Sequence, residues 1–309
     1  MKLNEAYHPA LEALPPPGGN GFHLAIFRVA CIGRDAGVDP VQIVTDLRAH
    51  TKPGGRVVPQ HEVIDAVFAA FREESHGAPP YAGPRVRPDF LAQCLKDGHG
   101  ATVDDIARRS PVPLDFSENE GWRVLPFLYA PEELLFIGDD RVQGLPGRSI
   151  RPAGEWQAIL ERLGRVLMPK VIPNPLSGKP APKKSGEGET YRGDANVAAH
   201  RFAVAECDSM SLEDQLAFWM GCPSLPVVAL ILSGKKSVHA WLRADCKDSA
   251  AWEREIAGKL FPSFLVPLGM DPACKNPARL SRMPGHLRRE TGQVQQIIYL
   301  APKGKAVNS

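Results

Sequence analysis

Two segments in the second half of the chain, RFAVAECDSM at 201–210 and LILSGKKSVHAWLRAD at 230–245, alternate apolar and polar residues. Alternate residues of a β-strand point to opposite faces, so this pattern predicts two strands with one apolar and one polar face. If the strands are neighbours, two carboxylates and an imidazole converge on one face of a sheet, where they could hold divalent metal and a phosphorylated ligand. The polar positions are Glu206, Asp208, Ser237 and His239, and the apolar ones are Ala203, Ala205, Cys207, Val238, Ala240 and Leu242.

The first third of the chain has helical periodicity, with apolar residues recurring every three or four positions. The segments are 22–37, 38–50 and 59–75, separated by Gly and Pro, and Asp39 before Pro40 is a plausible helix start. After a second Pro/Gly-rich break at 75–88, Thr102 can cap a short helix that runs to about Arg109. The pattern therefore predicts an all-helical N-terminal domain over 1–112.

The remainder, 113–309, mixes strand and helix patterns and is expected to form a second domain. A helix capped by Ser211, with Asp214 three residues later, follows the first alternating segment. The Pro-, Gly- and Lys-rich stretch 173–194 has no periodicity, so it is either a functional loop or a disordered one. The expected strands are 124–130, 134–138, 201–207, 226–232, 237–244 and 293–301, and the other expected helices are 153–167 and 249–260.

The amino-acid composition excludes few classes of protein. The net charge of +2, from 37 Lys and Arg against 35 Asp and Glu, gives no overall reason for a polyanionic partner. The six cysteines form no CxxC pair and no zinc-ligand spacing with histidine, so we expect no structural zinc and reduced thiols in a cytoplasmic protein. No signal peptide or membrane span is expected.

The acidic pair Glu206 and Asp208 stands at the end of a predicted strand. Carboxylates with this spacing can hold two Mg²⁺ or Mn²⁺ ions that activate an attacking hydroxyl and stabilise a leaving pyrophosphate. The alternative is a pair of ordinary solvated acids, and spacing alone does not decide between the two.

The segment SGKKS at 233–237 is not a phosphate-binding loop of the Walker type, because Ala229 stands where that motif needs a glycine. It predicts a tight turn with Lys235 or Lys236 at its tip, which places Ser237 and His239 at the start of the returning strand. A single histidine on a strand is often structural, but the cationic turn and the acidic pair favour a functional role here.

The segment 268–289 is dense in positive charge and interrupted by Pro and Gly. Only Asp271 and Glu290 are close in sequence as partners, so an anionic ligand is expected, and a solvated basic loop is the alternative. The charged residues after Asp271 are Lys275, Arg279, Arg282, His286, Arg288 and Arg289.

In order and spacing, these motifs resemble those of the archaeo-eukaryotic primase superfamily, in particular the primase-polymerases of phages and mobile elements. The matching residues are Glu206-Cys207-Asp208, Ser237-Val238-His239, and Asp271 followed by Arg282-Met283-Pro284-Gly285. The resemblance covers about 115–305. It implies an α+β (α/β) catalytic domain with an RRM-like sheet, preceded by a helical accessory domain. This sequence departs from the superfamily pattern in two ways. It lacks the superfamily's zinc-binding element, and Asp271 precedes an unusual Pro/Cys/Lys segment.

The resemblance also implies DNA-templated nucleotidyl transfer, as a primase or a DNA polymerase, by a two-metal mechanism. Glu206, Asp208 and Asp271 would hold Mg²⁺ or Mn²⁺, and His239 would act with them in catalysis. Ser237, His239, Lys236, Arg279 and Arg282 would bind the nucleotide, while Lys275, Arg288 and Arg289 would contact DNA.

The implied partners are a single-stranded DNA template, NTP or dNTP, and a separate replicative helicase, with no membrane. Two other functions fit the same residues: a non-catalytic replication initiator or nucleic-acid-binding protein, and a metal-dependent nuclease or phosphohydrolase. The segment TVDDIARRSP at 102–111 is either a DNA-binding helix of the helix-turn-helix type or a simple packing unit.

Overall fold

The computed structural model describes residues 4–18, 21–72, 88–142, 144–183, 186 and 188–308. Its contacts divide the chain into unit 1, Met1–Ala82, and unit 2, Gly83–Ser309. The expected break at 75–88 lies outside the described residues, except for Pro88. None of the described helices has the length and apolar character needed to cross a membrane.

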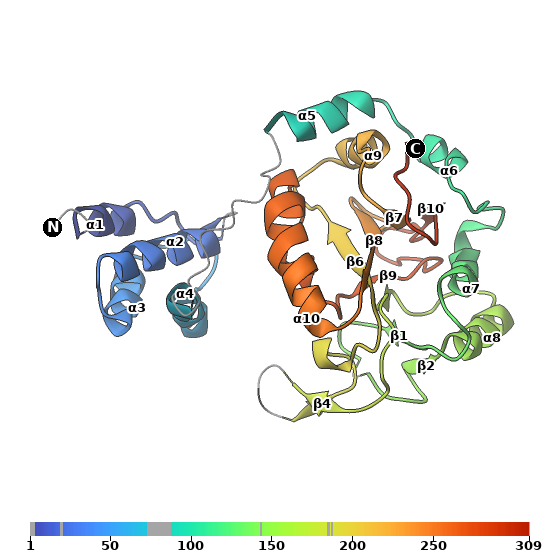
Figure 1. Cartoon of the computed structure of the whole chain (residues 1–309), viewed down its shortest axis with the longest axis horizontal. Coiled ribbons are helices and arrows are strands. Elements are labelled where there is room, and N and C mark those ends of the chain that lie inside the picture. The colour runs from blue at the N-terminus through green and yellow to red at the C-terminus, as the bar shows by residue number, and fades with distance from the viewer. Residues whose placement is uncertain are drawn as a thin grey trace. The chain divides into compact units, whose positions relative to one another are not determined.

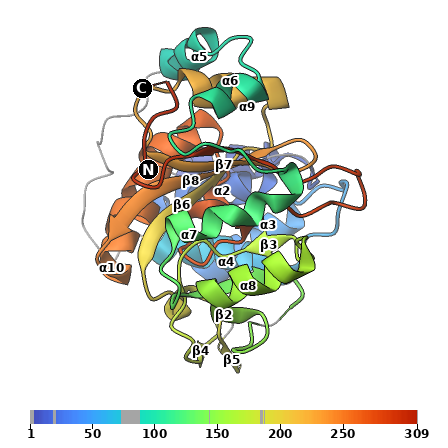
Figure 2. The ribbon, with the colours of Figure 1, turned by 90° about the vertical axis from the view of Figure 1, so that its right-hand side faces the viewer.

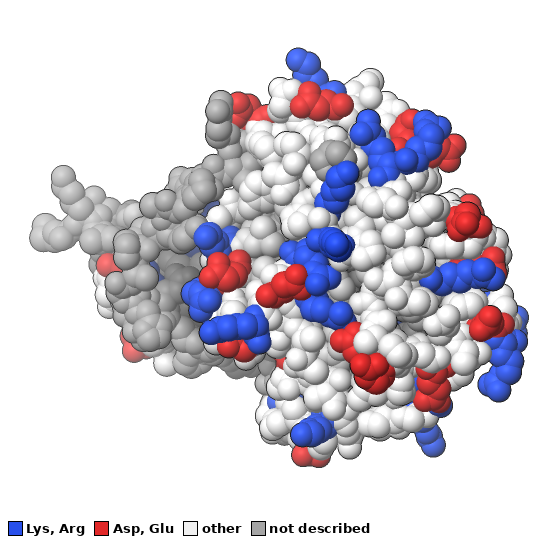
Figure 3. Space-filling model, turned by 45° about the vertical axis from the view of Figure 1, so that its right-hand side comes forward, with Lys and Arg blue, Asp and Glu red and all other residues white. Residues whose placement is uncertain are grey.

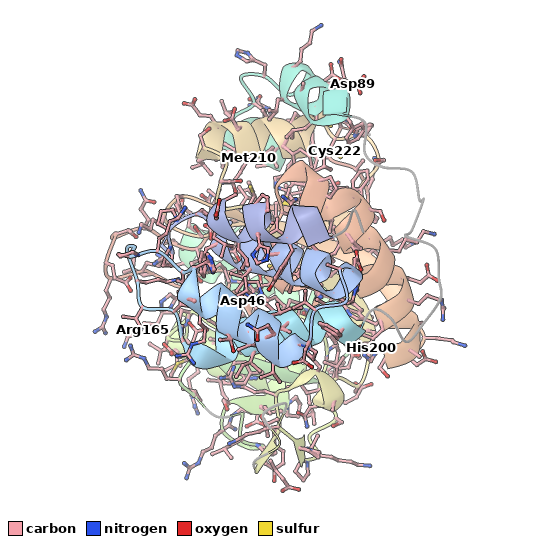
Figure 4. All side chains as sticks on the ribbon, turned by 90° about the vertical axis from the view of Figure 1, so that its left-hand side faces the viewer. Asp46, Asp89, Arg165, His200, Met210 and Cys222 are labelled. Atoms are coloured by element: carbon pink, nitrogen blue, oxygen red, sulfur yellow. The ribbon has the colours of Figure 1, made fainter. Side chains whose placement is uncertain are left out.

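The described part of unit 1 is helical, with an apolar core that includes Leu11, Ile26 and Ile43. The side chain of Asp39 accepts hydrogen bonds from the backbone N–H groups of Val41 and Gln42, so one helix begins where the sequence predicts. Tyr7 donates to Asp46, which Figure 4 labels, at 3.1 Å. The helices are α1 (Asn4–Glu12), α2 (Phe22–Asp35), α3 (Pro40–Ala49) and α4 (Gln60–Arg72).

Unit 2 contains two four-stranded antiparallel sheets and a two-stranded ribbon (Figure 1). The first sheet has the order β2-β1-β3-β9 and the second β10-β7-β8-β6. An RRM-like description of the second sheet stays a prediction. The strands are β1 (Leu134–Gly138), β2 (Ile150–Pro152), β3 (Lys170–Val171), β4 (Ala181–Pro182), β5 (Glu189–Thr190), β6 (His200–Glu206), β7 (Val227–Leu232), β8 (Val238–Cys246), β9 (Ser281–Arg282) and β10 (Ile297–Leu300).

Helices cover both faces of the second sheet. On one face lie α5 (Pro88–Asp97), α6 (Val103–Arg108), α9 (Leu212–Gly221) and α10 (Ser249–Trp252), which continues as the π-helix η4 (Glu253–Leu265). On the other face lie the 3₁₀ helix η2 (Glu118–Val124), α7 (Leu125–Leu128) and α8 (Ala153–Leu163), which are at the front of Figure 2. The remaining 3₁₀ turns are η3 (Asp194–Asn196), η5 (Val266–Leu268) and η6 (Pro272–Lys275).

The alternation in the sequence sorts the second sheet into these two layers. Ala203, Ala205 and Ala240 pack with the α5–α9–η4 layer. Phe202 and Trp241 belong to the core on the opposite face. Because Glu206 and His239 occupy the same alternate positions as Phe202 and Trp241, the pattern places both on this second face.

The strand expected at 124–130 is wrong, because most of this segment is helical as η2 and α7. Trp122, Leu125 and Leu128 are buried at helical spacing and pack against the sheet. Pro126 is the second residue of α7, a position where its missing N–H does no harm. The short apolar run had the composition of a strand but the spacing of a helix.

The division between the units falls before α5, earlier than the boundary expected at 112. Helices α5 and α9 lie side by side near Asp89 and Cys222 in Figure 4. Their approach is close: a Cβ on Gly98 would come within 1.9 Å of the Ala217 carbonyl oxygen, and one on Gly221 within 2.0 Å of the Cys94 oxygen. Helices α5 and α6 are therefore part of the core of unit 2.

A chain beginning at Gly83 is expected to fold, and one beginning at Pro113 is expected to fail. The shorter chain loses the buried side chains of Cys94 and Ile106 and uncovers α9. Each large apolar side chain buried contributes about 1.5–3 kcal/mol, a sizeable part of the roughly 5–15 kcal/mol that stabilises a domain. Thermal unfolding of both chains checks this, and equal melting temperatures would contradict the assignment of α5 and α6.

Candidate functional site

The ends of β6 and β8 bring the first two sequence motifs together. Glu206 and His239 are register partners in the antiparallel pair, and Glu206 Oε1 lies 3.4 Å from His239 Nε2. The third motif joins them through the backbone, because the Asp271 N–H donates to the Glu206 carbonyl at 2.8 Å. Three segments that are far apart in the sequence therefore meet at one point.

Asp271 lies in a turn rather than a strand. Its Oδ1 accepts from the Ala273 N–H at 2.9 Å and caps η6. Its Oδ2 lies 3.2 Å from Arg279 Nη2, and the same nitrogen lies 3.6 Å from Glu206 Oε2. One guanidinium thus contacts both carboxylates, a contact that the sequence did not predict.

His239 is buried, with only 1% of the residue exposed. Burial, helped by nearby Arg282, lowers its pKa well below the usual value, so the ring is neutral. Arg282 Nε donates to Nε2 at 3.3 Å, which assigns the ring proton to Nδ1, 3.5 Å from Ser281 Oγ. The contact between His239 and Glu206 is therefore not an ion pair.

Glu206 is also largely buried. Burial raises the pKa of its carboxyl group, and the positive charge of Arg279 opposes that rise. The Trp241 indole N–H donates to Ser281 Oγ at 2.8 Å and fixes that hydroxyl beside His239. The Nδ1 side of the His239 ring is therefore held in place by Ser281 and Trp241 in the core.

Lys170 is a residue that sequence reasoning missed. It is the register partner of Arg282 across β3 and β9, so two cations face each other. Burial, followed by the charge of Arg282, lowers the pKa of Lys170, whose Nζ lies 3.7 Å from Asp140 Oδ1. Its only signal in the sequence is a charged residue in the apolar, Pro-rich stretch at 166–175.

These residues form what we call the charged cluster: Glu206, His239, Asp271, Arg279, Arg282 and Lys170. Burial, followed by the charge of Arg288, also lowers the pKa of Arg282. Facing cations that are partly removed from water repel one another, and a bound anion would relieve this repulsion. The cluster joins the two sheets, because β6 and β8 belong to one and β3 and β9 to the other.

Asp208 and Ser237 lie beside the cluster in different surroundings. Asp208 is exposed and its Oδ1 lies 3.2 Å from Lys236 Nζ, whose side chain is exposed as well. Ser237 is buried, and it lines a cavity of about 340 Å³ together with Lys235, Gln293 and Gln296. Ser237 and His239 of the S-x-H motif therefore have different surroundings. Ser237 adjoins this cavity, and His239 lies in the charged cluster.

Gln215 of α9 holds the start of β8, and sequence reasoning missed this role too. Its Oε1 accepts from the Val238 N–H at 2.8 Å, and its Nε2 donates to the carbonyls of Met210 and Lys236 at 3.0 and 3.1 Å. The buried amide therefore ties the segment after Asp208 to the segment before His239. A polar residue in the apolar part of a capped helix is its only signal.

The other basic residues differ in their exposure and in their contacts. Lys275 and Arg289 are exposed. Arg288 donates to the Ser233 carbonyl at 3.2 Å and lies 3.7 Å from Glu290, so it braces the turn between β7 and β8. On the face drawn in Figure 3, Lys and Arg side chains gather near the centre with Asp and Glu close by.

Among the described residues, no three His, Cys, Asp or Glu side chains are gathered closely enough to hold a metal ion. Each proposed carboxylate ligand instead contacts a cationic side chain: Glu206 and Asp271 contact Arg279, and Asp208 contacts Lys236. Carboxylate oxygens are the ligands that Mg²⁺ and Mn²⁺ prefer. The chemistry of these donors therefore suits a divalent cation, but in this structure the three carboxylates are not gathered at one point.

No protein-family model matches the chain, and a comparison with curated proteins finds no relative. Among solved structures, the chain is similar to the AEP domain (PP-N190) of the primase-polymerase (PrimPol) of cyanophage S-2L. The similarity covers 62% of this chain and 95% of that chain, with 18% sequence identity and a TM-score of 0.40. A similarity at this level assigns no family or activity to the chain, so the function proposed below rests on the charged cluster.

Proposed function

We propose that the protein is a metal-dependent nucleotidyltransferase that adds nucleotides on a single-stranded DNA template, as a primase or a DNA polymerase. The observation that carries this proposal is the charged cluster, in which three separate motifs bring two carboxylates and a histidine next to opposed, partly buried cations. Carboxylates can bind metal and the cations can bind phosphates, which is the charge arrangement that phosphoryl transfer requires. The motif resemblance to primase-polymerases adds support.

In this proposal Glu206, Asp208 and Asp271 hold Mg²⁺ or Mn²⁺. When bound, these ions would activate the attacking hydroxyl group and neutralise the charge of the leaving pyrophosphate. Asp208 is the most exposed of the three and contributes least to the fold, with a side-chain exposure of 62%.

The cations of the site bind the triphosphate of the incoming NTP or dNTP. Arg282 is the strongest candidate, because its Nε is fixed by His239 and its planar guanidinium can present two further N–H groups to phosphate oxygens. Neutral His239 would act on the triphosphate by orienting Arg282, and Ser237 would meet the triphosphate from the adjoining cavity. Lys236, Arg279 and Lys170 supply further positive charge.

Lys275, Arg288 and Arg289 are proposed to contact the DNA backbone, and a separate helicase would open the duplex. The first test of the site is equilibrium titration with a labelled, non-hydrolysable nucleoside triphosphate, with and without Mn²⁺. Saturable binding that Mn²⁺ strengthens supports the proposal. Triphosphate binding that is absent, or that does not respond to Mn²⁺, would contradict it.

Replacing Arg289 with Ala is expected to flatten the salt dependence of DNA binding. An exposed arginine that meets one phosphate releases about one counterion, so the slope of log K against log salt should fall by about one. Binding of a labelled oligonucleotide over a salt series measures this slope. Arg254→Ala, which removes an exposed arginine on η4, is the matched control, and equal slopes for parent and Arg289→Ala would assign Arg289 to the solvated surface.

A further inference from the structure

Arg279 occupies an unusual place within the proposed site. Its Nη2 lies 3.2 Å from Asp271 Oδ2 and 3.6 Å from Glu206 Oε2, the two carboxylates that the proposed function makes metal ligands. Its Nη1 is 3.4 Å from the Ala273 carbonyl oxygen, a long contact. The single positive charge of the guanidinium therefore offsets part of the negative charge that a divalent cation would need.

A guanidinium and a divalent cation compete for these oxygens. Both are attracted by the same two negative charges, and each repels the other at short range. Asp271 Oδ2 accepts from Arg279 and Glu206 Oε2 lies beside it, so a divalent cation that approached these two oxygens would meet a positive charge already in place. Repulsion by Arg279 therefore weakens metal binding until its side chain moves away, and its 28% exposure leaves part of the side chain open to solvent.

The displaced guanidinium needs another anion close by. The neighbouring cations Arg282 and Lys170 face each other across β3 and β9, and the charge of Arg279 also acts on Lys170, so a triphosphate bound there would attract the guanidinium. A charge-assisted contact to phosphate would replace the contact that Arg279 loses. Metal and nucleotide would then assist each other's binding, and the assistance is reciprocal.

We propose that Arg279 is a resident counter-cation that holds the metal-free site closed and passes from the carboxylates to the nucleotide when metal binds. This inference rests on the proposed function and adds regulation to it: the site binds metal weakly until a nucleotide accepts Arg279. Arg254 and Glu255 of η4 form an ion pair outside the charged cluster, and both side chains are exposed, so solvent screens the interaction. Arg254 is therefore a matched control for Arg279.

The test measures Mn²⁺ binding without nucleotide, by the loss of the free Mn²⁺ signal in electron paramagnetic resonance. Arg279→Met removes the charge and keeps most of the side-chain length, and it is expected to bind Mn²⁺ about tenfold more tightly than the parent. Arg279→Lys should stay within about threefold of the parent because the positive charge remains, and the control Arg254→Met should change the affinity by less than about threefold.

The same Arg279→Met variant should bind the triphosphate more weakly at saturating Mn²⁺, by about tenfold. Opposite changes in the two affinities support the counter-cation role. Unchanged Mn²⁺ affinity together with weaker triphosphate binding would overturn it and leave Arg279 as a simple nucleotide ligand. Weaker binding of both, or a melting temperature lowered by more than about 5 °C, a shift of about 1 kcal/mol or more in a protein of this size, would overturn it in favour of a structural tether.

Failure of the inference can be distinguished from failure of the proposed function. If the parent extends primers and binds both Mn²⁺ and triphosphate, but Arg279→Met has parental Mn²⁺ affinity, the inference alone is wrong. If neither protein binds Mn²⁺ at millimolar concentration and the parent does not extend primers, the carboxylates are not metal ligands and both proposals are wrong.

Discussion

Glu206→Gln and Asp208→Asn are each expected to lower nucleotide incorporation by about 100-fold or more, because each removes a negative charge from the proposed metal site. Both replacements keep the size of the side chain. Asp208 is exposed, and Glu206 keeps a polar group beside His239, so the folded structure should persist. Incorporation of labelled nucleotide on a primed template measures the effect, and circular dichroism checks the fold.

Glu213→Gln is the control, because Glu213 is an exposed carboxylate at the start of α9 and lies outside the charged cluster. It should incorporate nucleotide at the parental rate. Incorporation by Glu206→Gln or Asp208→Asn within a few-fold of the parent would remove that residue from the metal site.

Arg282→Ala is expected to weaken triphosphate binding by about 10- to 150-fold, which corresponds to the roughly 1.5–3 kcal/mol of a charge-assisted hydrogen bond. Arg282 faces Lys170, and its Nε is fixed by His239, so its guanidinium is oriented before the ligand arrives. Arg282→Lys should recover only part of the affinity, because an ammonium group has no planar fork. Fluorescence titration with a labelled triphosphate measures both variants.

The affinity of Arg282→Ala for single-stranded DNA is the comparison for its affinity for triphosphate. The loss for Arg282→Ala should be larger for triphosphate than for single-stranded DNA, since the residue lies within the charged cluster and is only partly exposed. Equal losses for the two ligands would assign Arg282 to general electrostatic attraction. Full recovery of triphosphate affinity by lysine would contradict a bidentate contact.

The sequence predicted the parts of the fold that depend on local periodicity. The alternation in 201–207 and 237–244 gave two strands whose apolar positions pack with helices, and Ser211, Asp39 and Thr102 begin helices as expected. The convergence of Glu206 and His239 on one face followed from the assumption that these strands are neighbours, and the structure makes them register partners. In each case the signal lies within a few residues of the chain.

Features that depend on long-range packing could not be predicted in this way. The run at 124–130 has a strand-like composition, but its apolar residues meet the sheet at helical spacing. The sequence pattern assigned helices α5 and α6 to an N-terminal domain. Their close approach to α9 instead makes them part of unit 2. A boundary between domains depends on which core a helix joins, and local periodicity does not contain that information.

The charged cluster shows the same limit. The acidic pair, the S-x-H motif and Asp271 were each visible in the sequence, but Lys170 was not, because its partner Arg282 is more than 100 residues away and pairs with it only through β3 and β9. Arg279 was expected at the nucleotide, yet its contacts in this structure are to Glu206 and Asp271. Side-chain partners across sheets come from topology, which composition and spacing do not determine.

Extension of a labelled primer on a single-stranded DNA template tests the central proposal most directly. The full chain is incubated with primer–template, Mn²⁺ or Mg²⁺, and either NTPs or dNTPs, with an unprimed template and Glu206→Gln alongside as further reactions. The proposal predicts products longer than the primer, or new chains on the unprimed template, that require metal and are absent with Glu206→Gln. Shortened DNA would indicate a nuclease and bound but unchanged DNA a binding protein, and either result, without extension under any of these conditions, would contradict the proposal.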